Sequence, residues 1–377
     1  MKILFTGGGT AGHINPAVAL AHYFKKTEPD SEILYVGATG GMESRLVPEE
    51  GINFKGITIS GFSRKLNIEG FKKNLQTLKN IIIASKESKK ILKEFKPDIC
   101  IGTGGYVCGP LLRTAGKMKI PFIIHDSNSF PGVTTKLLAR KASKVLVINE
   151  EAKKHLPKNL KNIEITGTPV RENIAVCDKA EAKQKLGIDN DYPVILSFGG
   201  SLGAKAINDV MAKFIIKHKN DDINFIHGFG KRGHFVEDEL TKNGIDLKNP
   251  KYNIKEYIKN MAECLAAADL VICRAGATTL SEIQIAKKPA ILIPSPNVAE
   301  NHQYYNAMAL VNENAASIIE EKNFSFETLE KEVSKILENN KKIANDYAKN
   351  LGRIAITGSC ERIYEISKKV INKREKR

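Results

Sequence analysis

The sequence predicts an α/β protein made of two Rossmann-like domains that face each other across a cleft. Three observations support this fold class. The chain has 377 residues, and domains average roughly 100–200 residues. Short apolar runs alternate with longer amphipathic stretches, which is typical of βαβ units around a parallel sheet. A glycine-rich turn follows the first predicted strand of each half.

The apolar runs place the strands in two sets. In the first half we expect strands at 2–6, 33–36, 99–102, 122–125 and 144–147. In the second half we expect them at 194–197, 224–227, 270–273 and 290–293. Amphipathic helical stretches, such as 71–95 and 261–268, lie between strands, as βαβ crossovers require.

A polar segment at 166–191 separates the two sets of strands and contains Pro169. We therefore expect an N-terminal domain over residues 1–165 and a C-terminal domain over 166–342. The last stretch, 343–377, has a helical pattern and a basic end. We expect it to pack back toward the N-terminal domain.

The charge is strongly positive and unevenly distributed. The chain has 58 Lys and Arg against 42 Asp and Glu, a formal net charge of +16. Residues 1–165 hold +12 of that excess. Such a surface suits nucleic acid, an acidic membrane or a phosphorylated substrate. A Lys-rich composition without a specific partner is the alternative.

Composition also excludes several classes of protein. No stretch approaches the ~18–20 apolar residues that a membrane-spanning helix needs. The apolar run at 1–5 is too short for the core of a signal peptide. The six cysteines form no CxxC pair, so we expect thiols in a reducing cytoplasm and no zinc site.

The first glycine loop follows the first predicted strand. Gly7, Gly9 and Gly12 match GxGxxG, in which glycines allow a sharp turn and the next helix offers N–H groups to an anion. A nicotinamide enzyme would have an acidic residue at the end of the second strand. Residues 36–39 are Val-Gly-Ala-Thr, which argues against NAD. A tight βα turn without a ligand is the alternative.

Further glycine turns follow other predicted strands, at 102–106 and 199–204. All three turns would lie at the carboxyl ends of parallel strands, where open α/β sheets bind ligands. Ser201 in the third turn could cap the next helix and donate to a phosphate oxygen.

A fourth segment, 273–282, follows a strand and should begin a helix. Its amides can hold a diphosphate, to which Thr278 and Thr279 add hydroxyls. Glu282, one turn further on, suits ribose hydroxyls. It could instead be an acid favoured by the helix dipole. Gln303 could reach a sugar or lie on the surface.

Together these segments resemble the MurG family of glycosyltransferases, which make the disaccharide of the lipid-linked peptidoglycan precursor. The match covers both halves in the family's order, at 7–16, 102–110, 125–132, 167–171, 199–204, 261–282 and 303–307. The resemblance implies the two-Rossmann GT-B glycosyltransferase architecture, with the acceptor and the membrane bound by the N-terminal domain and the UDP-sugar by the C-terminal domain.

The resemblance also implies the reaction. UDP-N-acetylglucosamine donates its sugar to the 4-hydroxyl of N-acetylmuramoyl-pentapeptide carried on undecaprenyl diphosphate. The anomeric configuration inverts, UDP leaves, and lipid I becomes lipid II. The family's role in peptidoglycan synthesis connects it with cell shape and cell division.

The family's binding residues carry over by motif. The implied contacts to UDP-N-acetylglucosamine are Thr10, Ala11, Gly12, Asn128, Arg171, Ser201, Ile258, Ala277, Thr278, Thr279, Leu280, Ser281, Glu282 and Gln303. The implied contacts to the acceptor diphosphate are Gly104, Gly105 and Tyr106. The sequence departs from the family pattern at Ala11, where many members have Gly, at the pair 126–127, and in the stretch 295–301.

Inverting transfer needs a base at the acceptor hydroxyl and stabilisation of the leaving diphosphate. Helix N-termini and Arg171 can supply the second without a metal, so no metal or cofactor is expected. His13 is the first candidate for the base, because imidazole titrates near neutrality. It could instead only position its neighbours. Asp126 is the second candidate, and His125 could orient the site.

One predicted helix suits a membrane surface. Its apolar residues at near-helical spacing are Leu75, Leu78, Ile81, Ile82 and Ile83. The lysines around them are Lys72, Lys73, Lys79, Lys86, Lys89, Lys90, Lys93 and Lys96. This pattern favours an interfacial helix on anionic lipid, or else an ordinary helix with its isoleucines in the core. We expect a peripheral protein at the cytoplasmic face of the plasma membrane, where other cell-wall synthesis proteins are further candidate partners.

Three other functions compete with this interpretation. One is a different UDP-sugar enzyme, such as a glycolipid synthase or UDP-N-acetylglucosamine 2-epimerase. The second is a nicotinamide oxidoreductase, which the missing acid disfavours. The third is a nucleic-acid-binding protein, which charge alone suggests and for which no recognisable motif is present.

Overall fold

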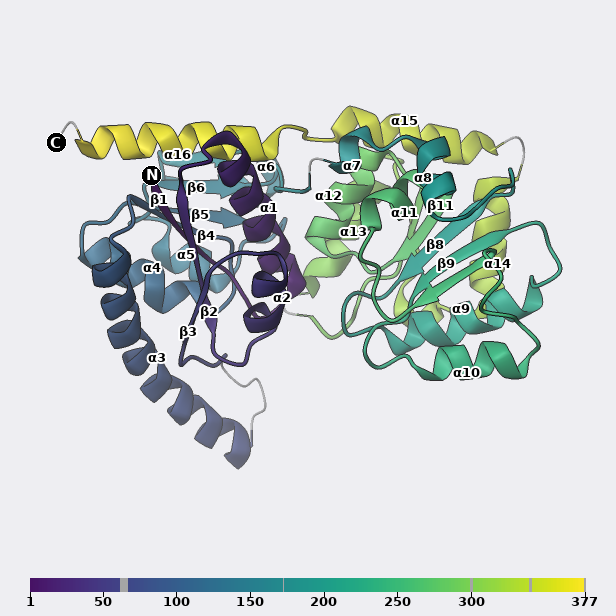
Figure 1. The fold of residues 1–377 in the computed structure, drawn as a ribbon, viewed down its shortest axis with the longest axis horizontal. Coiled ribbons are helices and arrows are strands. Elements are labelled where there is room, and N and C mark those ends of the chain that lie inside the picture. Colours follow the sequence, from purple (N-terminus) through teal and green to yellow (C-terminus); the bar gives the residue numbers. More distant parts are fainter. Residues whose placement is uncertain (62–66, 172, 299–300, 339–340, 376–377) are drawn as a thin grey trace. The chain divides into compact units, whose positions relative to one another are not determined.

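The computed structural model describes residues 1–61, 67–171, 173–298, 301–338 and 341–375. The chain forms two compact units (Figure 1). Unit 1 comprises Met1–Val170 and Thr357–Arg377, and unit 2 comprises Arg171–Ile356. Each unit is built around its own parallel sheet, so the two-domain Rossmann-like α/β class is confirmed.

The sheet of unit 1 has the strand order β3-β2-β1-β4-β5-β6-β7, with every neighbouring pair parallel. Its strands are β1 (Lys2–Thr6), β2 (Glu32–Ala38), β3 (Phe54–Ile57), β4 (Ile99–Gly102), β5 (Phe122–Asp126), β6 (Lys144–Val147) and β7 (Ile163–Ile165). The five expected strands are present. The edge strands β3 and β7 were not expected, because each is short and carries a charged residue among its apolar ones.

Helices cover both faces of this sheet. They are α1 (Ala11–Thr27), α2 (Glu43–Glu49), α3 (Ile68–Phe95), α4 (Cys108–Lys117), α5 (Val133–Leu138), α6 (Glu150–Lys154) and α16 (Ser359–Glu375). One apolar core includes residues of α3, α4 and the sheet. The other includes residues of α1, α16 and the sheet. The sheet of unit 1 is therefore buried on both faces, as parallel sheets usually are.

The last helix, α16, belongs to unit 1 although it is the last element of the chain (Figure 1). Tyr364 packs edge-on against Phe24 of α1, with ring centroids 5.2 Å apart. Its hydroxyl donates to Glu28 Oε1 at 2.7 Å. Within the expected terminal segment, α15 (Lys342–Ile354) lies in unit 2 and α16 lies in unit 1.

Unit 2 has a six-stranded parallel sheet in the order β10-β9-β8-β11-β12-β13. Its strands are β8 (Val194–Phe198), β9 (Asn224–Gly228), β10 (Tyr252–Lys255), β11 (Leu270–Cys273), β12 (Ala290–Leu292) and β13 (Ser317–Ile318). The four expected strands are present, and the outer strands β10 and β13 are additional.

Helices also surround the sheet of unit 2 (Figure 1). Besides α15 and a short 3-10 helix (Glu321–Asn323), they are α7 (Asn173–Val176), α8 (Lys179–Lys185), α9 (Lys205–Lys217), α10 (Phe235–Lys242), α11 (Met261–Ala267), α12 (Ala277–Ala286), α13 (His302–Val311) and α14 (Phe326–Leu337). The polar segment 166–191, which looked like a plain junction, contains the short helices α7 and α8.

The strand order fixes where each unit can bind a ligand. In unit 1, β1 lies between β2 and β4, so the chain leaves β1 and β4 toward opposite sides of the sheet. In unit 2, β8 lies between β9 and β11 in the same way. Such switch points open a crevice at the carboxyl ends of the strands. Among the described helices, none is long and apolar enough to cross a bilayer.

Candidate functional site

In unit 1, the loops that follow β1 and β4 interlock at the switch point. The Gly8 amide donates to the Gly104 carbonyl at 3.3 Å. Gly105 has φ +86°, and a Cβ there would lie 2.2 Å from the Gly8 carbonyl oxygen. Only glycine allows this approach. The first and second glycine loops therefore form one structural unit.

His13 lies in the first turn of α1, directly after the first glycine loop. Its Nδ1 is 3.1 Å from the Thr103 carbonyl oxygen. A carbonyl only accepts, so Nδ1 carries the hydrogen and Nε2 is the nitrogen that can take a proton. Thr103 Oγ1 donates back to the His13 carbonyl at 2.6 Å. The second loop thus fixes both the ring and the backbone of His13.

The carboxylate of Asp126, at the end of β5, is buried and saturated with hydrogen bonds. Its Oδ2 accepts from the Gly132 amide at 2.8 Å and from Thr135 Oγ1 at 2.7 Å. Its Oδ1 accepts from the backbone and side-chain nitrogens of Asn128 at 3.1 and 3.3 Å. This carboxylate therefore organises the loop that leads into α5 and sets the position of Asn128.

His125 is fully buried in β5. Its Nε2 donates to the Gly167 carbonyl at 2.8 Å, and its Nδ1 lies 3.3 Å from the Ser127 hydroxyl. Burial lowers the pKa of His125 below the usual range for histidine, so the ring is neutral. These contacts fix the ring of His125 between Ser127 and the segment at Gly167.

Thr10, Ala11 and Gly12, the implied donor contacts of unit 1, lie at the start of α1. Thr10 occupies the N-cap in an extended conformation without a side-chain capping hydrogen bond. Its carbonyl accepts from the His13 amide at 3.0 Å. Ala11 and Gly12 form the first turn and are half-buried. Tyr106, from the second loop, packs its ring against Gly9.

In unit 2, the third glycine loop packs against the loop that follows β9. The Lys231 amide donates to the Ser201 carbonyl at 3.3 Å. A Cβ on Gly203, which has φ +80°, would lie 2.1 Å from the Phe229 carbonyl oxygen. The expectation that Ser201 caps the next helix is wrong. The chain turns at Gly203, and the N-cap of α9 is Ala204, three residues after Ser201, without a side-chain cap.

The fourth segment forms the start of α12, as expected. Gly276 is the N-cap, and no side chain caps the helix, so the first-turn amides of Ala277 and Thr278 lie at its positive end. Ser281 Oγ donates back to the Ala277 carbonyl at 3.1 Å. The helix N-terminus is therefore suited to an anion through its backbone.

Glu282, one turn inside α12, has a perturbed acidity. Burial raises its pKa to about 7, and the positive charge of Arg171 opposes that shift. Arg171, Leu280 and Glu282 all belong to unit 2. A carboxyl poised near neutrality beside a cation is a frequent property of functional sites.

Three further side chains shape the loops of unit 2. Gln303 Oε1 accepts from the Ser295 amide at 2.9 Å, and Asn306 Nδ2 donates to the Ala275 carbonyl at 3.3 Å. Arg274 donates to the Ile293 carbonyl at 3.1 Å and pairs with Glu321. Neither Arg274 nor Asn306 was predicted, because their roles depend on contacts far along the chain. Their position in segments that otherwise match the family was the available signal.

Ile258 follows β10 and is buried. A Cβ on Gly228 would lie 3.0 Å from Ile258 Cδ1, so the side chain packs directly on the end of β9. This position lies at the carboxyl edge of the sheet of unit 2.

Glu43 in unit 1 was also missed. It is fully buried, and its carboxylate accepts from the amides of Gly9 and Ala38 at 3.1 and 2.9 Å. The end of β2 itself carries no acidic residue. Glu43, the first residue of α2, nevertheless places a carboxylate next to the end of that strand. The glycines around it, at 37, 40 and 41, were the signal in the sequence.

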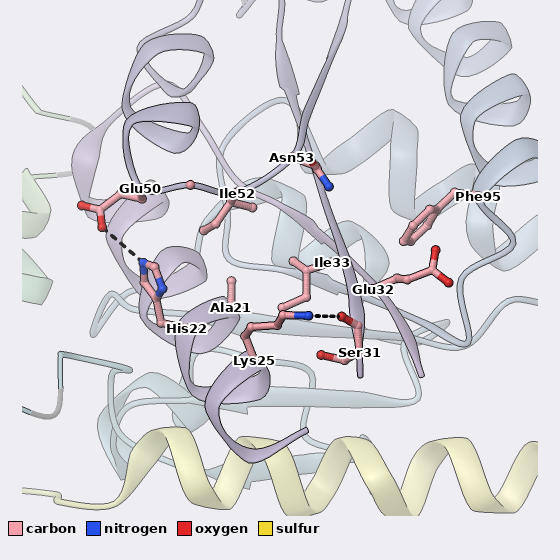
Figure 2. A pocket seen from close by; sticks show the side chains of 11 residues that line it. Ala21, His22, Lys25, Ser31, Glu32, Ile33, Glu50, Ile52, Asn53 and Phe95 are labelled. Carbon is pink, nitrogen blue, oxygen red and sulfur yellow. Dashed lines mark hydrogen bonds and ion pairs between the residues drawn. The ribbon is translucent and has the colours of Figure 1, made fainter. Parts of the chain in front are cut away.

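A cavity of about 300 Å³ in unit 1 lies apart from these residues (Figure 2). It is lined by α1, by the start of β2, by residues 50–53 ahead of β3, and by Phe95 at the end of α3. His22 Nε2 lies 3.2 Å from Glu50 Oε2 there, and Lys25 Nζ donates to the Ser31 carbonyl at 2.9 Å. None of the predicted site residues lines this cavity. Within the described ranges, no cluster of three His, Cys, Asp or Glu side chains could hold a metal ion.

Fold and site together define a protein with two Rossmann-like units whose glycine loops and helix N-termini suit phosphorylated ligands. Comparison with known proteins narrows this class. The glycosyltransferase family 28 N-terminal domain matches residues 3–147, and the family 28 C-terminal domain matches residues 194–365. The chain belongs to glycosyltransferase family 28 and, within it, to the MurG family.

Individual relatives cover nearly the whole chain. A protein of Acetivibrio thermocellus is 44% identical over 372 residues, which are 98% of each chain. One of Clostridioides difficile is 41% identical over all of this chain and 90% of its own. Both are described as UDP-N-acetylglucosamine--N-acetylmuramyl-(pentapeptide) pyrophosphoryl-undecaprenol N-acetylglucosamine transferase. The crystal structure of Acinetobacter baumannii MurG is 26% identical, with a TM-score of 0.70 over 98% of this chain and 99% of that one.

Proposed function

We propose that this chain transfers N-acetylglucosamine from UDP-N-acetylglucosamine to the 4-hydroxyl of undecaprenyl-diphosphate-linked N-acetylmuramoyl-pentapeptide. The chain is a UDP-N-acetylglucosamine-dependent glycosyltransferase that converts lipid I to lipid II in peptidoglycan synthesis. The full-length relationship to transferases of that description carries this conclusion. It favours this reaction over a glycolipid synthase or a UDP-N-acetylglucosamine 2-epimerase.

Unit 2 binds the nucleotide in this proposal. The uncapped N-terminus of α12 receives the diphosphate through the amides of residues 277–279, and Arg171 adds a positive charge. The Glu282 carboxylate accepts from the ribose hydroxyls, and Gln303 approaches the donor from α13. Ser201 contributes a hydroxyl from the third loop, and Ile258 packs near the uracil ring of the nucleotide. Arg274 and Asn306 support this site through the loops that they hold.

Unit 1 carries the acceptor chemistry. Nε2 of His13 takes the proton of the acceptor 4-hydroxyl while the oxygen attacks C1 of the donor sugar. The bond from C1 to the diphosphate oxygen breaks, UDP leaves with its electron pair, and the configuration at C1 inverts. Asn128 contacts the sugar, and the second loop, at Gly104, Gly105 and Tyr106, receives the acceptor diphosphate.

His13 fits the role of the base better than Asp126 does. The Thr103 carbonyl holds the tautomer in which Nε2 accepts the proton. Both carboxylate oxygens of Asp126 are already occupied by four hydrogen bonds, from Asn128, Gly132 and Thr135. Asp126 and His125 then position Asn128 and the end of β5.

The function is tested with purified protein, UDP-N-acetylglucosamine labelled in the sugar, and lipid I in detergent. The expected result is a labelled lipid-linked disaccharide in the β configuration together with stoichiometric UDP. If UDP forms without a lipid-linked product, or if UDP-N-acetylmannosamine appears, the proposed reaction is wrong.

Replacing the base gives the first specific prediction. His13→Ala removes general base catalysis, which typically contributes 10²–10⁴-fold, so we expect kcat to fall by about that factor. UDP affinity, measured by calorimetry, is expected to change less than about twofold, because unit 2 holds the nucleotide. His22→Ala, on the same helix but outside the site, is the matched control. Turnover of His13→Ala near the wild-type value would remove His13 from the mechanism.

The membrane surface is proposed to meet the outer face of α3. Phe71, Leu75, Leu78 and Ile82 are 73%, 52%, 53% and 62% exposed. Their spacing of four, three and four residues places them on one helix face. The buried residues Thr77, Ala84, Ser88 and Ile91 occupy another. The alternative in which the isoleucines lie in the core is wrong for Ile82 and Ile83, which are 62% and 41% exposed, while Ile81 is half-buried.

Lysines complete this face of unit 1. Lys72 and Lys79 flank the apolar stripe, and Lys86, Lys89 and Lys93 continue it toward the end of α3, all of them exposed. In Figure 1 the first turns of α3 extend beyond the other helices of unit 1. An exposed apolar stripe with a basic extension suits peripheral binding to anionic lipid at the cytoplasmic face of the plasma membrane.

Liposome co-sedimentation tests this surface. The triple variant Leu75→Ser, Leu78→Ser, Ile82→Ser is expected to lose at least tenfold in affinity for vesicles that contain phosphatidylglycerol, since each buried apolar side chain contributes about 1.5–3 kcal/mol. Val176→Ser, which changes an apolar residue of unit 2 that is even more exposed, at 80%, serves as the control. Equal binding of wild type to neutral and anionic vesicles at low salt would contradict the role of the lysines.

A further inference from the structure

The buried carboxylate of Glu43 joins the first glycine loop of unit 1 to the segment between β2 and α2, about thirty residues further along the chain. Glu43 is the first residue of α2, and its side chain is fully buried. Oε2 accepts from the Gly9 amide in the first glycine loop at 3.1 Å. Oε1 accepts from the Ala38 amide at the end of β2 at 2.9 Å. A buried carboxylate is tolerated only with such donors.

Three glycines leave the space that this carboxylate fills. A Cβ on Gly8 would lie 2.2 Å from Glu43 Oε1. A Cβ on Gly37 would lie 2.4 Å from its Cγ, and one on Gly41 would lie 2.8 Å from its Cδ. Any side chain at these three positions would have to displace Glu43. The backbone around it is therefore shaped for this one side chain.

The polar groups of the first glycine loop are engaged inside unit 1. Tyr35 donates its hydroxyl to the Gly7 carbonyl at 2.8 Å, and the Gly8 amide donates to Gly104. The Gly9 amide, which a phosphate would use in a dinucleotide site, donates to Glu43 instead. The loop up to Gly9 therefore acts as a support for α1, whose first turn carries His13.

We propose that Glu43 is a positioning residue for the transfer reaction. Its carboxylate takes the place of a ligand anion at Gly9 and holds the first loop against the second. The N-terminus of α1 and the ring of His13 are thereby kept where the second loop can orient them. Tyr106 packs on the same Gly9, so the acceptor loop depends on the same contact. This inference rests on the proposed function and on His13 as its base.

Steady-state kinetics of Glu43→Ala and Glu43→Gln test the role of the carboxylate. In Glu43→Gln the side chain keeps its shape, but its NH₂ group would face the amide of Gly9 or Ala38. Two donors then face each other, so one of the two hydrogen bonds is lost. We expect kcat to fall by about 10–100-fold in both variants, because small misplacements of catalytic groups have effects of that size. UDP affinity is expected to stay within about twofold. Glu49→Ala, on the same helix but exposed and paired with Arg45, is the control and should match the wild type.

Chemical rescue separates positioning from general stability. Glu43→Ala leaves a space lined by two amide donors, so formate or acetate should restore part of its kcat. The same anions should not rescue Glu43→Gln, whose amide still fills the space. Gly8→Ala should reproduce the fall in kcat. Its Cβ would displace the Glu43 carboxylate from the two amide donors, although Glu43 itself is unchanged. Gly109→Ala, where a Cβ would meet only Thr134 at 3.9 Å, is the control for adding a methyl group.

Two outcomes would overturn the inference. One is a kcat within twofold of the wild-type value for folded Glu43→Gln or Gly8→Ala, whatever their melting temperatures. The other is equal stimulation of the alanine and glutamine variants by formate, which would indicate a general salt effect. If the wild type itself forms no lipid-linked disaccharide, the proposed function fails instead. If Glu43→Ala does not fold, Glu43→Gln and Gly8→Ala decide the question.

Discussion

In the proposed donor site, Glu282 is the residue whose protonation bears most directly on nucleotide binding. Burial raises its pKa to about 7 in the folded chain, above the ordinary value of 4.5. The folded state therefore binds this proton more tightly than the unfolded state, and the group lowers stability as pH rises from 4.5 toward 7. In the proposed donor site, by contrast, the ribose hydroxyls donate to the ionised form of Glu282.

UDP affinity is therefore expected to rise with pH. With a pKa of about 7, the ionised fraction of Glu282 grows about tenfold between pH 6 and pH 8, and the association constant should follow it. Calorimetric titrations at several pH values measure this. In Glu282→Gln, the part of the increase in UDP affinity that comes from Glu282 should be absent. Only the part that comes from ionisation of the UDP phosphate should remain. An identical pH profile in both proteins would exclude a contact between Glu282 and the ribose.

At the scale of residues, the sequence predicted the local part of the site and missed the part that depends on distant contacts. The glycine loops and the start of α12 are visible because loop, cap and helix are adjacent in sequence. Glu43 and Gly9 are 34 residues apart, and Arg274 and Glu321 are 47 apart. The capping role of Ser201 was wrong because the turn at Gly203 delays the helix.

At the scale of elements, long apolar runs determined the central strands, and the edges were harder to predict. β3, β7, β10 and β13 have two to four residues each and lie at or near the sheet edges, where pairing with a neighbour decides the structure. For α3, the hydrophobic pattern predicts the helix correctly but does not show which face is buried, because its most apolar stripe is exposed. Periodicity identifies a helix, but the packing of its neighbours decides which face is buried.

The packing of α16 on α1 gives a prediction about stability. Tyr364 is buried against Phe24, so Tyr364→Ala should destabilise unit 1 by about 3 kcal/mol, the usual cost of removing a buried aromatic ring. Tyr364→Phe removes only the hydrogen bond to Glu28 and should cost about 1 kcal/mol or less. Urea unfolding followed by circular dichroism measures both. Equal losses in the two variants would assign the effect to the hydrogen bond and not to packing.

At the scale of the whole molecule, two units that each bury their own sheet predict two unfolding events. UDP at 100 times its Kd should stabilise the nucleotide-binding unit by about 2.7 kcal/mol. For a unit of this size that is a rise in melting temperature of about 5–10 °C. Differential scanning calorimetry should show one transition that moves with UDP and another that moves with Tyr364→Ala. A single transition that shifts as a whole under both changes would contradict independent cores.

The position of α16 also has a consequence for synthesis on the ribosome. Most of unit 1 precedes unit 2 in the chain, yet its sheet gains the cover that α16 provides only after all of unit 2 has been made. At roughly 5–20 residues per second, that interval lasts on the order of 10–40 s. During it, the apolar surface that later meets Tyr364 and Ile363 stays exposed on the nascent chain. A chaperone that binds nascent chains at the ribosome would therefore meet unit 1 as an unfinished domain while unit 2 is being made.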